Sequence, residues 1–505
     1  MSDYPMLISN KLHSFRNFIL QKYDKSYNFA TYIRTNEKKI RRFMNERVSF
    51  GSKLGAILAA AGSAVGLGNI WRFPYETGNH GGAAFILIYL VCVFALGLPV
   101  MMSEFIVGRH SKASTGGAFK ALHPKGPWKC VGYLGVLTGF LILGYYAVVA
   151  GWTLEYMVQA IGGQFSGKTP DEFVADFQQF SQNPLRPLLW LAVFMLTTHF
   201  VIVKGVQKGI ERSSKVLMPL LFVLVVVLAI CSVTLPGAEK GISFLLKPDF
   251  SEVTPDVFLG AMGQAFFSLS LGMGCLSTYA SYFGKDTRLG KTAMSVGLID
   301  TGVAVLAGLI IFPAAFSVGI SPDAGPSLIF ITLPNVFQQA FSGVPVIAYV
   351  CSVLFYLLLA LAALTSTISL HEVSTAFLHE KFQLTRGRAA SVVTFCCFLI
   401  GVVSSLSLGE WSSFTIFGLN FFDALDYLTA KIMLPVAGML TAIFVGWVIN
   451  RQIVRDEVTN YGTLRAPYYS LFFFVLRYIA PVGIAIIFVN ELGLLKYVEK
   501  LLLLF

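Results

Sequence analysis

Two apolar stretches of the chain are each interrupted by a cluster of glycine and serine. The first reads GSAVGLGNIWRFP at 62–74, and the second reads AFFSLSLGMG at 265–274. Glycine frees the backbone from its Cβ restraint, so peptide groups here can turn away from helical hydrogen bonds. In a bilayer, unpaired peptide groups cost several kcal/mol each, and a break persists only where protein or a polar cavity receives them. Freed carbonyls can bind a cation and freed amides an anion, so the two breaks predict a binding site near the middle of a membrane.

Each break also has a purely structural explanation. Gly62 and Gly66 have the spacing at which two helices cross closely, and serines such as Ser268 and Ser270 often bond to the preceding helical turn. For the break at Gly62 and Gly66, spacing alone does not decide between a binding site and a close helix crossing. Two such breaks in separate segments favour binding, because one half-helix N-terminus can hold a carboxylate and one C-terminus an amine.

The remaining sequence supplies the helices that would hold both breaks in a membrane. The 505 residues are 55% hydrophobic and 13% charged, whereas soluble proteins carry roughly twice that charge. A membrane helix needs about 20 apolar residues, and about eleven segments qualify. They lie near 53–75, 83–108, 133–160, 187–203, 209–235, 256–283, 290–318, 345–378, 387–407, 424–449 and 468–490. The sequence therefore predicts an all-α polytopic membrane protein.

The net charge of +11 lies mainly in alternate loops, which argues against a nucleic-acid partner. Basic residues gather within 11–47, 109–129, 204–215, 285–291, 381–388 and 451–465. The intervening loops hold Asp171, Glu172, Asp176, Asp249, Glu252 and Asp256. This positive-inside pattern places the N-terminus in the cytoplasm and, with eleven spans, the C-terminus outside. We expect no signal peptide. Because no Asn-x-Ser/Thr acceptor occurs, we expect a bacterial inner membrane.

The N-terminal segment and the cysteines are the two remaining features of the sequence. The basic segment 1–48 has apolar residues at helical spacing, and it is either a surface helix or a flexible cytoplasmic tail. The seven cysteines fall mostly in apolar spans. Their spacing indicates neither a disulfide framework nor a metal site, and we interpret them as small buried hydrophobic residues.

Several motifs resemble the neurotransmitter:sodium symporter family, which includes the bacterial leucine transporter. They are NIWRFP at 69–74, Tyr145–Tyr146, KGIE at 208–211, TYASY at 278–282, LTST at 364–367 and DALDYLTAKIMLP at 423–435. The resemblance spans roughly 47–490. It implies a transporter domain at 49–490, with two inverted five-helix repeats at about 49–236 and 256–449 and helix 11 at 468–490. Helices 1 and 6 would be unwound at mid-membrane, and 491–505 would be a short extracytoplasmic tail.

The resemblance also implies two sodium sites, and no organic cofactor. The first would use Ala64, Asn69, Ser268, Asp300 and the substrate carboxylate. The second would use Gly62, Val65, Ala362, Thr365 and Ser366. Mostly neutral oxygens suit a singly charged hard cation better than a divalent one. By spacing alone, Thr365 and Ser366 could equally be helix-packing hydroxyls.

Substrate class follows from the residue at position 66. Relatives that carry biogenic amines have aspartate there, whereas this chain has Gly66, so the resemblance implies an amino acid that brings its own carboxylate. Tyr146 would donate to that carboxylate, and Gly144 would leave extra volume. The implied pocket residues are Ser63, Ala64, Leu67, Gly68, Ile142, Tyr146, Phe267, Ser268, Ser270, Met273, Ser366 and Leu370. An apolar lining favours an aliphatic or aromatic side chain, although each apolar residue alone could be ordinary core.

Charge pairs are the implied gates. Arg72 and Asp426 would close the outer path, with Phe267 as a lid beneath them. Arg47 and Glu380 would close the inner path with help from Tyr282, although Arg47 could instead snorkel to the interface. The family usually has aspartate at the position of Glu380. Glu104 and Glu372 lie deep in apolar segments, and we expect them to bond to each other or share a proton.

Together these features predict a sodium-coupled symporter that imports a hydrophobic amino acid by alternating access. Asp300 stands where chloride-dependent relatives have asparagine, so transport would be independent of chloride. The alternative within the same fold is a non-transporting receptor or partner subunit. A membrane enzyme is disfavoured because no catalytic motif occurs, and a channel because the pocket is apolar. The sequence leaves the oligomeric state open.

Overall fold

The structure is a computed structural model that describes residues 48–319 and 328–494. Two compact units are distinguished, Met1–Ser49 and Phe50–Phe505. Most of the predicted N-terminal segment and of the predicted tail, together with the gate residue Arg47, lies outside the described residues. Within the described residues of the second unit every regular element is helical, which agrees with the predicted all-α class.

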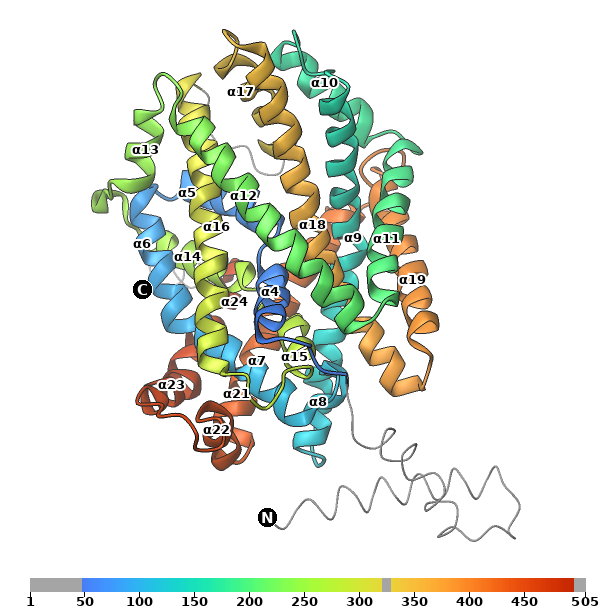
Figure 1. Cartoon of the computed structure of the whole chain (residues 1–505), viewed down its shortest axis with the longest axis vertical. Coiled ribbons are helices and arrows are strands. Elements are labelled where there is room, and N and C mark those ends of the chain that lie inside the picture. The colour runs from blue at the N-terminus through green and yellow to red at the C-terminus, as the bar shows by residue number, and fades with distance from the viewer. Residues whose placement is uncertain (1–47, 320–327, 495–505) are drawn as a thin grey trace, which may run out of the picture. The chain divides into compact units, whose positions relative to one another are not determined.

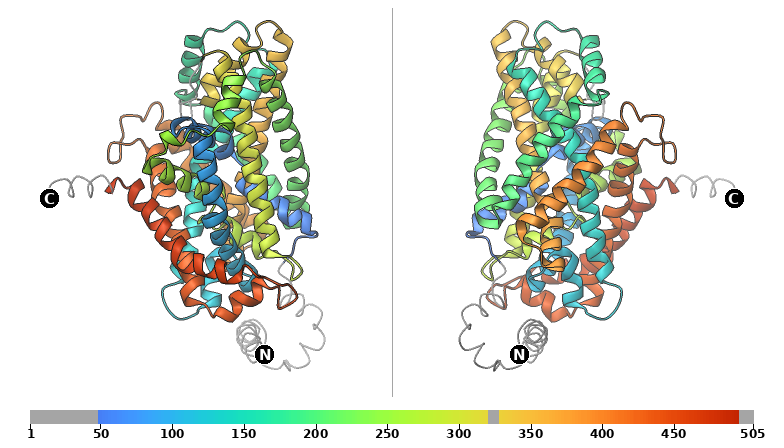
Figure 2. Two further views of the ribbon diagram at one scale, coloured as in Figure 1. Left: turned by 90° about the vertical axis from the view of Figure 1, so that its left-hand side faces the viewer. Right: turned by 90° about the vertical axis from the view of Figure 1, so that its right-hand side faces the viewer.

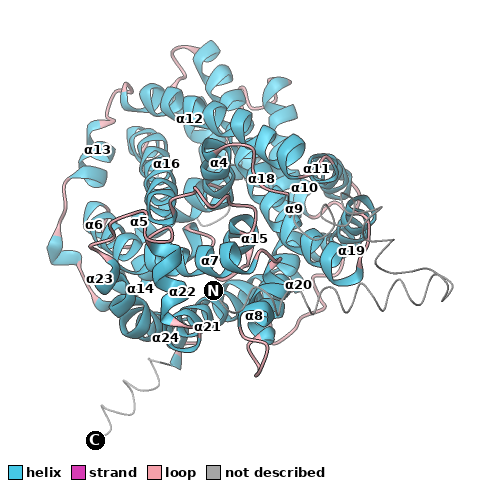
Figure 3. Ribbon diagram, turned by 60° about the horizontal axis from the view of Figure 1, so that its bottom comes forward, coloured by secondary structure: helices cyan, strands magenta, loops and turns pink. Residues whose placement is uncertain are grey.

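The first glycine-rich break bends a helix near the centre of this unit. Helix α4 (Lys53–Ala64) ends at the break, and the chain resumes in the wide-turned helix η1 (Gly68–Arg72) and α5 (Phe73–Asn79), bent by 53° from α4. Val65 takes an extended conformation, with ψ 112°, which ends the α-helical ladder. Helices α12, α15, α16 and α18 surround α4 (Figure 3).

The second break separates α14 (Pro255–Ser268) from α15 (Cys275–Ala280). Ser270, Gly272 and Gly274 have φ values of +55°, +84° and +75°, a backbone region that favours glycine. A Cβ on Gly272 would also lie 2.4 Å from the carbonyl oxygen of Leu434. The glycine is therefore required both by conformation and by close backbone packing.

Long helices enclose the two broken ones and run between the same two ends of the unit (Figures 1 and 2). Several of these long helices consist of consecutive segments, in which a short wide-turned segment (η) adjoins or joins α-helices. In chain order the segments are α6 (Ala83–Cys92), η2 (Val93–Gly97), α7 (Leu98–Ser111), α9 (Lys129–Ile161), α11 (Arg186–Val203), η3 (Val206–Glu211), α12 (Arg212–Val233), α16 (Leu289–Ser317), α18 (Pro345–Phe382), α19 (Arg386–Leu406), α20 (Phe421–Asp426), η6 (Tyr427–Met433), α21 (Leu434–Ile443), η7 (Phe444–Val448), α23 (Tyr469–Phe474), η8 (Val475–Ile479) and α24 (Ala480–Glu491). The described residues contain nine helices long and apolar enough to cross a membrane, or ten with the bent pair. The predicted segment 256–283 is divided between α14 and α15, so a total of eleven spans stays a prediction.

Short helices mark the two ends. At one end lie α8 (Thr115–Leu122) and α22 (Arg451–Val458), which belong to the basic stretches 109–129 and 451–465. At the other end lie α10 (Pro170–Ser181), α13 (Glu239–Leu246) and α17 (Leu333–Ala340) (Figure 1). Two single turns, η4 (Phe250–Glu252) and η5 (Leu328–Thr332), complete the described elements.

One glycine has a different role from the one predicted. A Cβ on Gly144 would lie 2.5 Å from Ile400 Cγ2, so this glycine lets α9 approach α19 closely. Our prediction that Gly144 enlarges the substrate pocket was wrong.

Candidate functional site

The two breaks meet at a cavity of about 170 Å³. Every residue predicted to bind substrate lines this cavity, and these residues come from the α4 break, α9, the α14 break and α18. The cavity is lined in addition by Gly66, Trp71, Tyr145, Val149, Cys275, Phe422, Asp423 and Asp426. Segments far apart in the sequence thus converge on one small space.

The polar end of the cavity lies at the first break. The backbone N–H of Leu67 donates to the Tyr146 hydroxyl at 3.3 Å, so this hydroxyl borders a peptide group outside the helical ladder. A Cβ on Gly66 would lie 2.5 Å from Ser366 Oγ and 3.4 Å from the Tyr146 hydroxyl. A side chain at position 66 would therefore require Ser366 to move, and an aspartate there would have to displace it.

The opposite end of the cavity is apolar. Ile142, Met273 and Leu370 contribute to it from three different segments, and Phe267 covers it on the outer side. Ser270 adds little free polarity, because its hydroxyl donates to the Ser63 carbonyl at 2.8 Å. A ligand with a charged head and a hydrophobic side chain matches this division.

A buried polar cluster adjoins the cavity at the residues predicted for the first ion. Asn69 Nδ2 donates to Asp300 Oδ1 at 2.7 Å and to Ser268 Oγ at 3.2 Å. Ser268 Oγ donates to Asp300 Oδ2 at 2.7 Å. Asn69 Oδ1 accepts the N–H of Gly66 at 2.9 Å, and Ala64 lines the same cavity. Asn69, Ser268 and Asp300 are each at most 2% exposed, so their oxygens are shielded from bulk water.

The residues predicted for the second ion also come together. Thr365 Oγ1 lies 2.9 Å from the Ala362 carbonyl and 3.3 Å from the Val65 carbonyl. Ser366 Oγ lies 3.4 Å from the same Val65 oxygen. A Cβ on Gly62 would lie 3.4 Å from Thr365 Cβ, so the first break and α18 touch here.

These two clusters are built mainly from neutral oxygens. Among the described residues no group of three His, Cys, Asp or Glu side chains is placed to hold a metal ion. Asp300 is the single carboxylate in the first cluster, and the predicted second cluster has none. Such donor sets suit a monovalent cation better than a divalent one.

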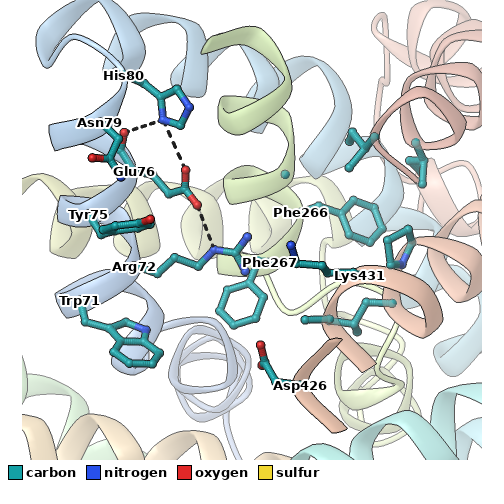
Figure 4. Close-up of a pocket in the computed structure, with 16 residues that line it drawn as sticks. Trp71, Arg72, Tyr75, Glu76, Asn79, His80, Phe266, Phe267, Asp426 and Lys431 are labelled. Carbon is teal, nitrogen blue, oxygen red and sulfur yellow. Dashed lines mark hydrogen bonds and ion pairs between the residues drawn. The ribbon is translucent and has the colours of Figure 1, made fainter. Parts of the chain in front are cut away.

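The predicted outer gate pair is not formed in this structure. Arg72 Nε lies 3.6 Å from Glu76 Oε1, and its guanidinium carbon lies 4.4 Å from the centre of the Phe267 ring. Asp426 instead accepts a hydrogen bond from the Tyr145 hydroxyl at 3.0 Å. Arg72, Glu76 and Asp426 line a second cavity of about 600 Å³ on the outer side of the Phe267 ring (Figure 4). Glu76 stands one helical turn after Arg72, so this pair forms within one helix and needs no particular tertiary arrangement.

The inner gate is described in part. Arg47 lies outside the described residues, and Glu380 accepts the N–H of Ser114 at 2.7 Å. The Tyr282 hydroxyl donates to Glu372 Oε1 at 2.6 Å, and both oxygens of Glu372 bind Arg386. Tyr282 therefore joins an ion pair that our sequence analysis missed.

The two buried glutamates have separate partners. Glu104 Oε1 accepts the N–H of Gly272 at 2.7 Å, whereas Glu372 binds Arg386 and Tyr282. The prediction that they bond to each other was wrong. Glu104 instead accepts a hydrogen bond from a peptide N–H that the second break leaves without a helical partner. Any helix break within a membrane leaves such peptide groups, and they must find hydrogen-bond partners within the protein.

Sequence reasoning also missed Tyr145, Trp71 and Phe422 as cavity residues. Tyr145 belongs to one of the family motifs, and it stands beside Tyr146 on α9. In a helix, neighbouring side chains point in directions about 100° apart, so a wide cavity can contact both tyrosines. Helical geometry could therefore have predicted that Tyr145 also lines the cavity.

The chain is similar in sequence and in structure to known sodium-dependent transporters. The model of the "Sodium:neurotransmitter symporter family" matches residues 47–176 and 173–500. The chain is similar to the crystal structure of MhsT in complex with L-phenylalanine, with a TM-score of 0.81 and 45% identity, over 88% of this chain and 100% of that one. It is 39% identical over 451 residues to the sodium-dependent transporter YhdH of Bacillus subtilis (strain 168), covering 89% of this chain and 99% of the relative. A sodium-dependent transporter of Haemophilus influenzae is 36% identical over 460 residues, covering 88% of this chain and 98% of the relative.

Proposed function

The chain belongs to the sodium:neurotransmitter symporter family and is a sodium-dependent membrane transporter rather than an enzyme, and we propose that it imports a hydrophobic amino acid together with Na⁺. The preferred substrates are aliphatic or aromatic amino acids of medium to large size. Transport is driven by the sodium gradient and does not require chloride.

The cavity at the two breaks is the observation that carries this proposal. Its polar end holds the Tyr146 hydroxyl and the backbone around Gly66, which suit a carboxylate. Its other end holds Ile142, Met273 and Leu370, which suit an apolar side chain. The similar MhsT structure is a complex with L-phenylalanine, and that ligand combines the same two features.

Two sodium ions are proposed beside the substrate. The first binds at Ala64, Asn69, Ser268 and Asp300 with help from the substrate carboxylate, which couples ion binding to substrate binding directly. The second binds at Gly62, Val65, Ala362, Thr365 and Ser366. Because this second set joins the first break to α18, an ion there would hold the two segments together and its release would let them part.

Alternating access supplies the transport step. Phe267 lines both the inner cavity of about 170 Å³ and the outer one of about 600 Å³. Movement of this ring, together with pairing of Arg72 and Asp426, would close the outer path. We further propose eleven spans in two inverted repeats, at 49–236 and 256–449, in a bacterial inner membrane with a cytoplasmic N-terminus.

Counterflow in proteoliposomes tests the function. Vesicles preloaded with unlabelled phenylalanine and Na⁺ should accumulate labelled phenylalanine or leucine, and replacing Na⁺ with K⁺ should abolish the accumulation. Labelled lysine should not accumulate, because its charged end would meet the apolar lining. Tyr146→Phe should raise the half-saturating substrate concentration, whereas Tyr478→Phe, on the exposed face of η8, should match the parent.

A non-transporting receptor of the same fold predicts a different result. It would bind phenylalanine in the presence of Na⁺, measurable by scintillation proximity, without any counterflow. Binding without exchange in vesicles whose protein orientation has been verified would therefore overturn the proposed transport.

A further inference from the structure

A basic pocket lies at the end of the molecule that carries α8 and α22, away from both cavities of the transport site. It has a volume of about 890 Å³ and is formed by α22, the loop 459–468 and the first residues of α23. Arg451, Arg455 and Arg465 line it together with Tyr461 and Tyr469. The proposed transport mechanism uses none of these residues.

The arginines face this pocket without a carboxylate partner. Arg451 and Arg455 are four residues apart on α22 and share one face of it, while Arg465 comes from the loop opposite. In the part of the chain that the structure describes, no carboxylate oxygen lies within 4.0 Å of any of their side-chain nitrogens. Asp456 also lines the pocket, and its carboxylate accepts a hydrogen bond from Gln452 Nε2 at 2.7 Å. The lining is therefore positive overall.

The loop that carries Arg465 is anchored to the rest of the protein. The Tyr461 hydroxyl donates to Glu457 Oε1 at 2.8 Å, and Glu457 is buried against Arg109 of α7. The loop closes on itself through the bond from Leu464 N to the Thr459 carbonyl, at 2.9 Å. Because these contacts fix the loop, a ligand would meet a largely preformed pocket.

A strip of exposed apolar side chains begins directly beside the pocket. It runs along one face of α23, η8 and α24, and consists of Leu471, Phe474, Tyr478 and Val482, which are 66%, 52%, 46% and 59% exposed. Trp447 flanks the strip, with the Arg477 guanidinium 4.0 Å from its ring centre. Tryptophan, tyrosine and arginine gather where hydrocarbon meets lipid headgroups. This composition is typical of a surface that passes from lipid headgroups to acyl chains, and the pocket adjoins it in the chain.

We propose that this pocket binds the phosphate headgroup of an anionic phospholipid of the cytoplasmic leaflet, with the acyl chains along the strip from Leu471 to Val482. The guanidinium group is planar and matches phosphate with paired hydrogen bonds. Basic pockets on the cytoplasmic side of membrane proteins recognise such headgroups. The adjoining apolar strip favours a lipid over free phosphate, because a free ion would gain nothing from it.

Lipid retention by the full-length protein tests the proposal. The protein would be purified in mild detergent, incubated with dioleoyl phosphatidylglycerol, cardiolipin or dioleoyl phosphatidylcholine, and analysed by native mass spectrometry. We expect the anionic lipids to be retained and phosphatidylcholine to be lost. Arg455→Gln/Arg465→Gln should weaken retention of anionic lipid by about 25-fold, because each basic residue near the surface contributes about fivefold. Lys285→Gln/Arg388→Gln removes two exposed charges at the same end but outside the pocket, and should retain lipid like the parent.

Two further measurements distinguish a lipid headgroup from free phosphate and control for unfolding of the variant. Arg455→Lys/Arg465→Lys keeps the charge, so it should remain folded and retain lipid at an intermediate level. Sodium phosphate at 10-fold excess over lipid should not displace it. Equal loss in the pocket variant and the control variant would overturn the proposal, since it would indicate unspecific attraction. Displacement by inorganic phosphate, or equal retention of phosphatidylcholine, would overturn it as well.

Discussion

Asn69 donates its side-chain amide to Asp300 across 231 positions of sequence, with Nδ2 2.7 Å from Oδ1. The Oδ1 atom of the same side chain accepts a hydrogen bond from the Gly66 N–H, at 2.9 Å. One side chain therefore joins the first break to α16, and it does so in a fully buried position. Any ion bound at the predicted first site would be sensitive to this link.

Asn69→Ala should raise the sodium concentration needed for half-maximal uptake. The change removes a predicted ligand and leaves the buried Gly66 N–H and Asp300 carboxylate each without one partner, a cost of about 1–3 kcal/mol per unsatisfied group. We expect a shift of at least tenfold in sodium-dependent uptake. Asn335→Ala is the matched control, because Asn335 is also buried but bonds to Gln339 on α17. An unchanged sodium dependence in Asn69→Ala would remove the assignment of the first site.

Glu104 offers a test of whether a buried carboxyl acts by hydrogen bonding or by charge. Its Oε1 accepts the N–H of Gly272, and glutamine can accept the same bond while alanine cannot. Glu104→Gln should therefore resemble the parent in uptake and thermal unfolding. Glu104→Ala should lose stability by about 1–3 kcal/mol, because a buried N–H is left unpaired. Equal damage in both variants would instead show that the ionisable carboxyl itself is required.

Much of the site could be predicted from the sequence, because the glycine and serine clusters fix where the backbone leaves the helix. Once residues 62–68 and 268–274 are known to be breaks, the facing positions on α9 and α18 follow from helical periodicity. The side-chain pairs were harder to predict. Arg72 has a carboxylate four residues away in Glu76, and a pair at this spacing needs no particular tertiary arrangement. Glu372 is bound by Arg386, which becomes a neighbour only because the turn after α18 reverses the chain.

The same limit applies to Gly144. A glycine on a membrane helix can border a cavity or a neighbouring helix, and the sequence does not say which side it faces. In the structure it faces Ile400. Only the rotation of α9 about its axis, which is set by packing against α11, α18 and α19 together, decides between the two.

A pH-dependent contribution to stability is expected from Glu457, which lies outside the membrane-spanning helices. Burial alone would raise the pKa of Glu457, but the hydrogen bond from His110, the charge of Arg109 and the Tyr461 hydroxyl more than offset it, and the pKa lies below its usual value. A carboxyl with a lowered pKa stabilises the folded state above the unfolded pKa of about 4.3, and this contribution is lost as pH falls through the folded pKa.

The melting temperature of the detergent-solubilised protein should therefore fall as pH is lowered below about 4.3. In Glu457→Gln this dependence should be weaker, since the variant cannot take up that proton. Glu410→Gln changes an exposed carboxyl and should keep the parental profile. Identical profiles for the parent and Glu457→Gln would contradict the expected linkage.

The segment from Gly209 to Pro219 is expected to open when the transporter faces inward. Its first part is the wide-turned helix η3, and Pro219 lies inside α12, where it removes one backbone hydrogen bond. A Cβ on Gly62 would lie 3.3 Å from Met218 Sδ, so this segment packs beside the proposed second ion site. Hydrogen exchange across 209–219 should quicken when Na⁺ is replaced by K⁺, whereas exchange across 220–230 of the same helix should stay slow. An ordinary proline kink would give equally slow exchange in both conditions.

Asp300 should make transport independent of chloride. A zwitterionic substrate with two Na⁺ adds two positive charges to a buried site, and a fixed carboxylate nearby lowers the energy of that arrangement. The groups that could otherwise hold an anion are already directed to this carboxylate: Asp300 Oδ2 accepts from Ser268 at 2.7 Å and from the Tyr89 hydroxyl at 3.4 Å.

Replacing chloride with gluconate on both sides of the membrane should leave parental uptake unchanged. Asp300→Asn removes the charge while keeping the size, so its uptake should become chloride-stimulated or be lost. Thr301→Val, which alters a neighbouring hydroxyl but no charge, should stay insensitive to chloride. Loss of parental uptake in gluconate would show that the fixed charge does not replace a mobile anion.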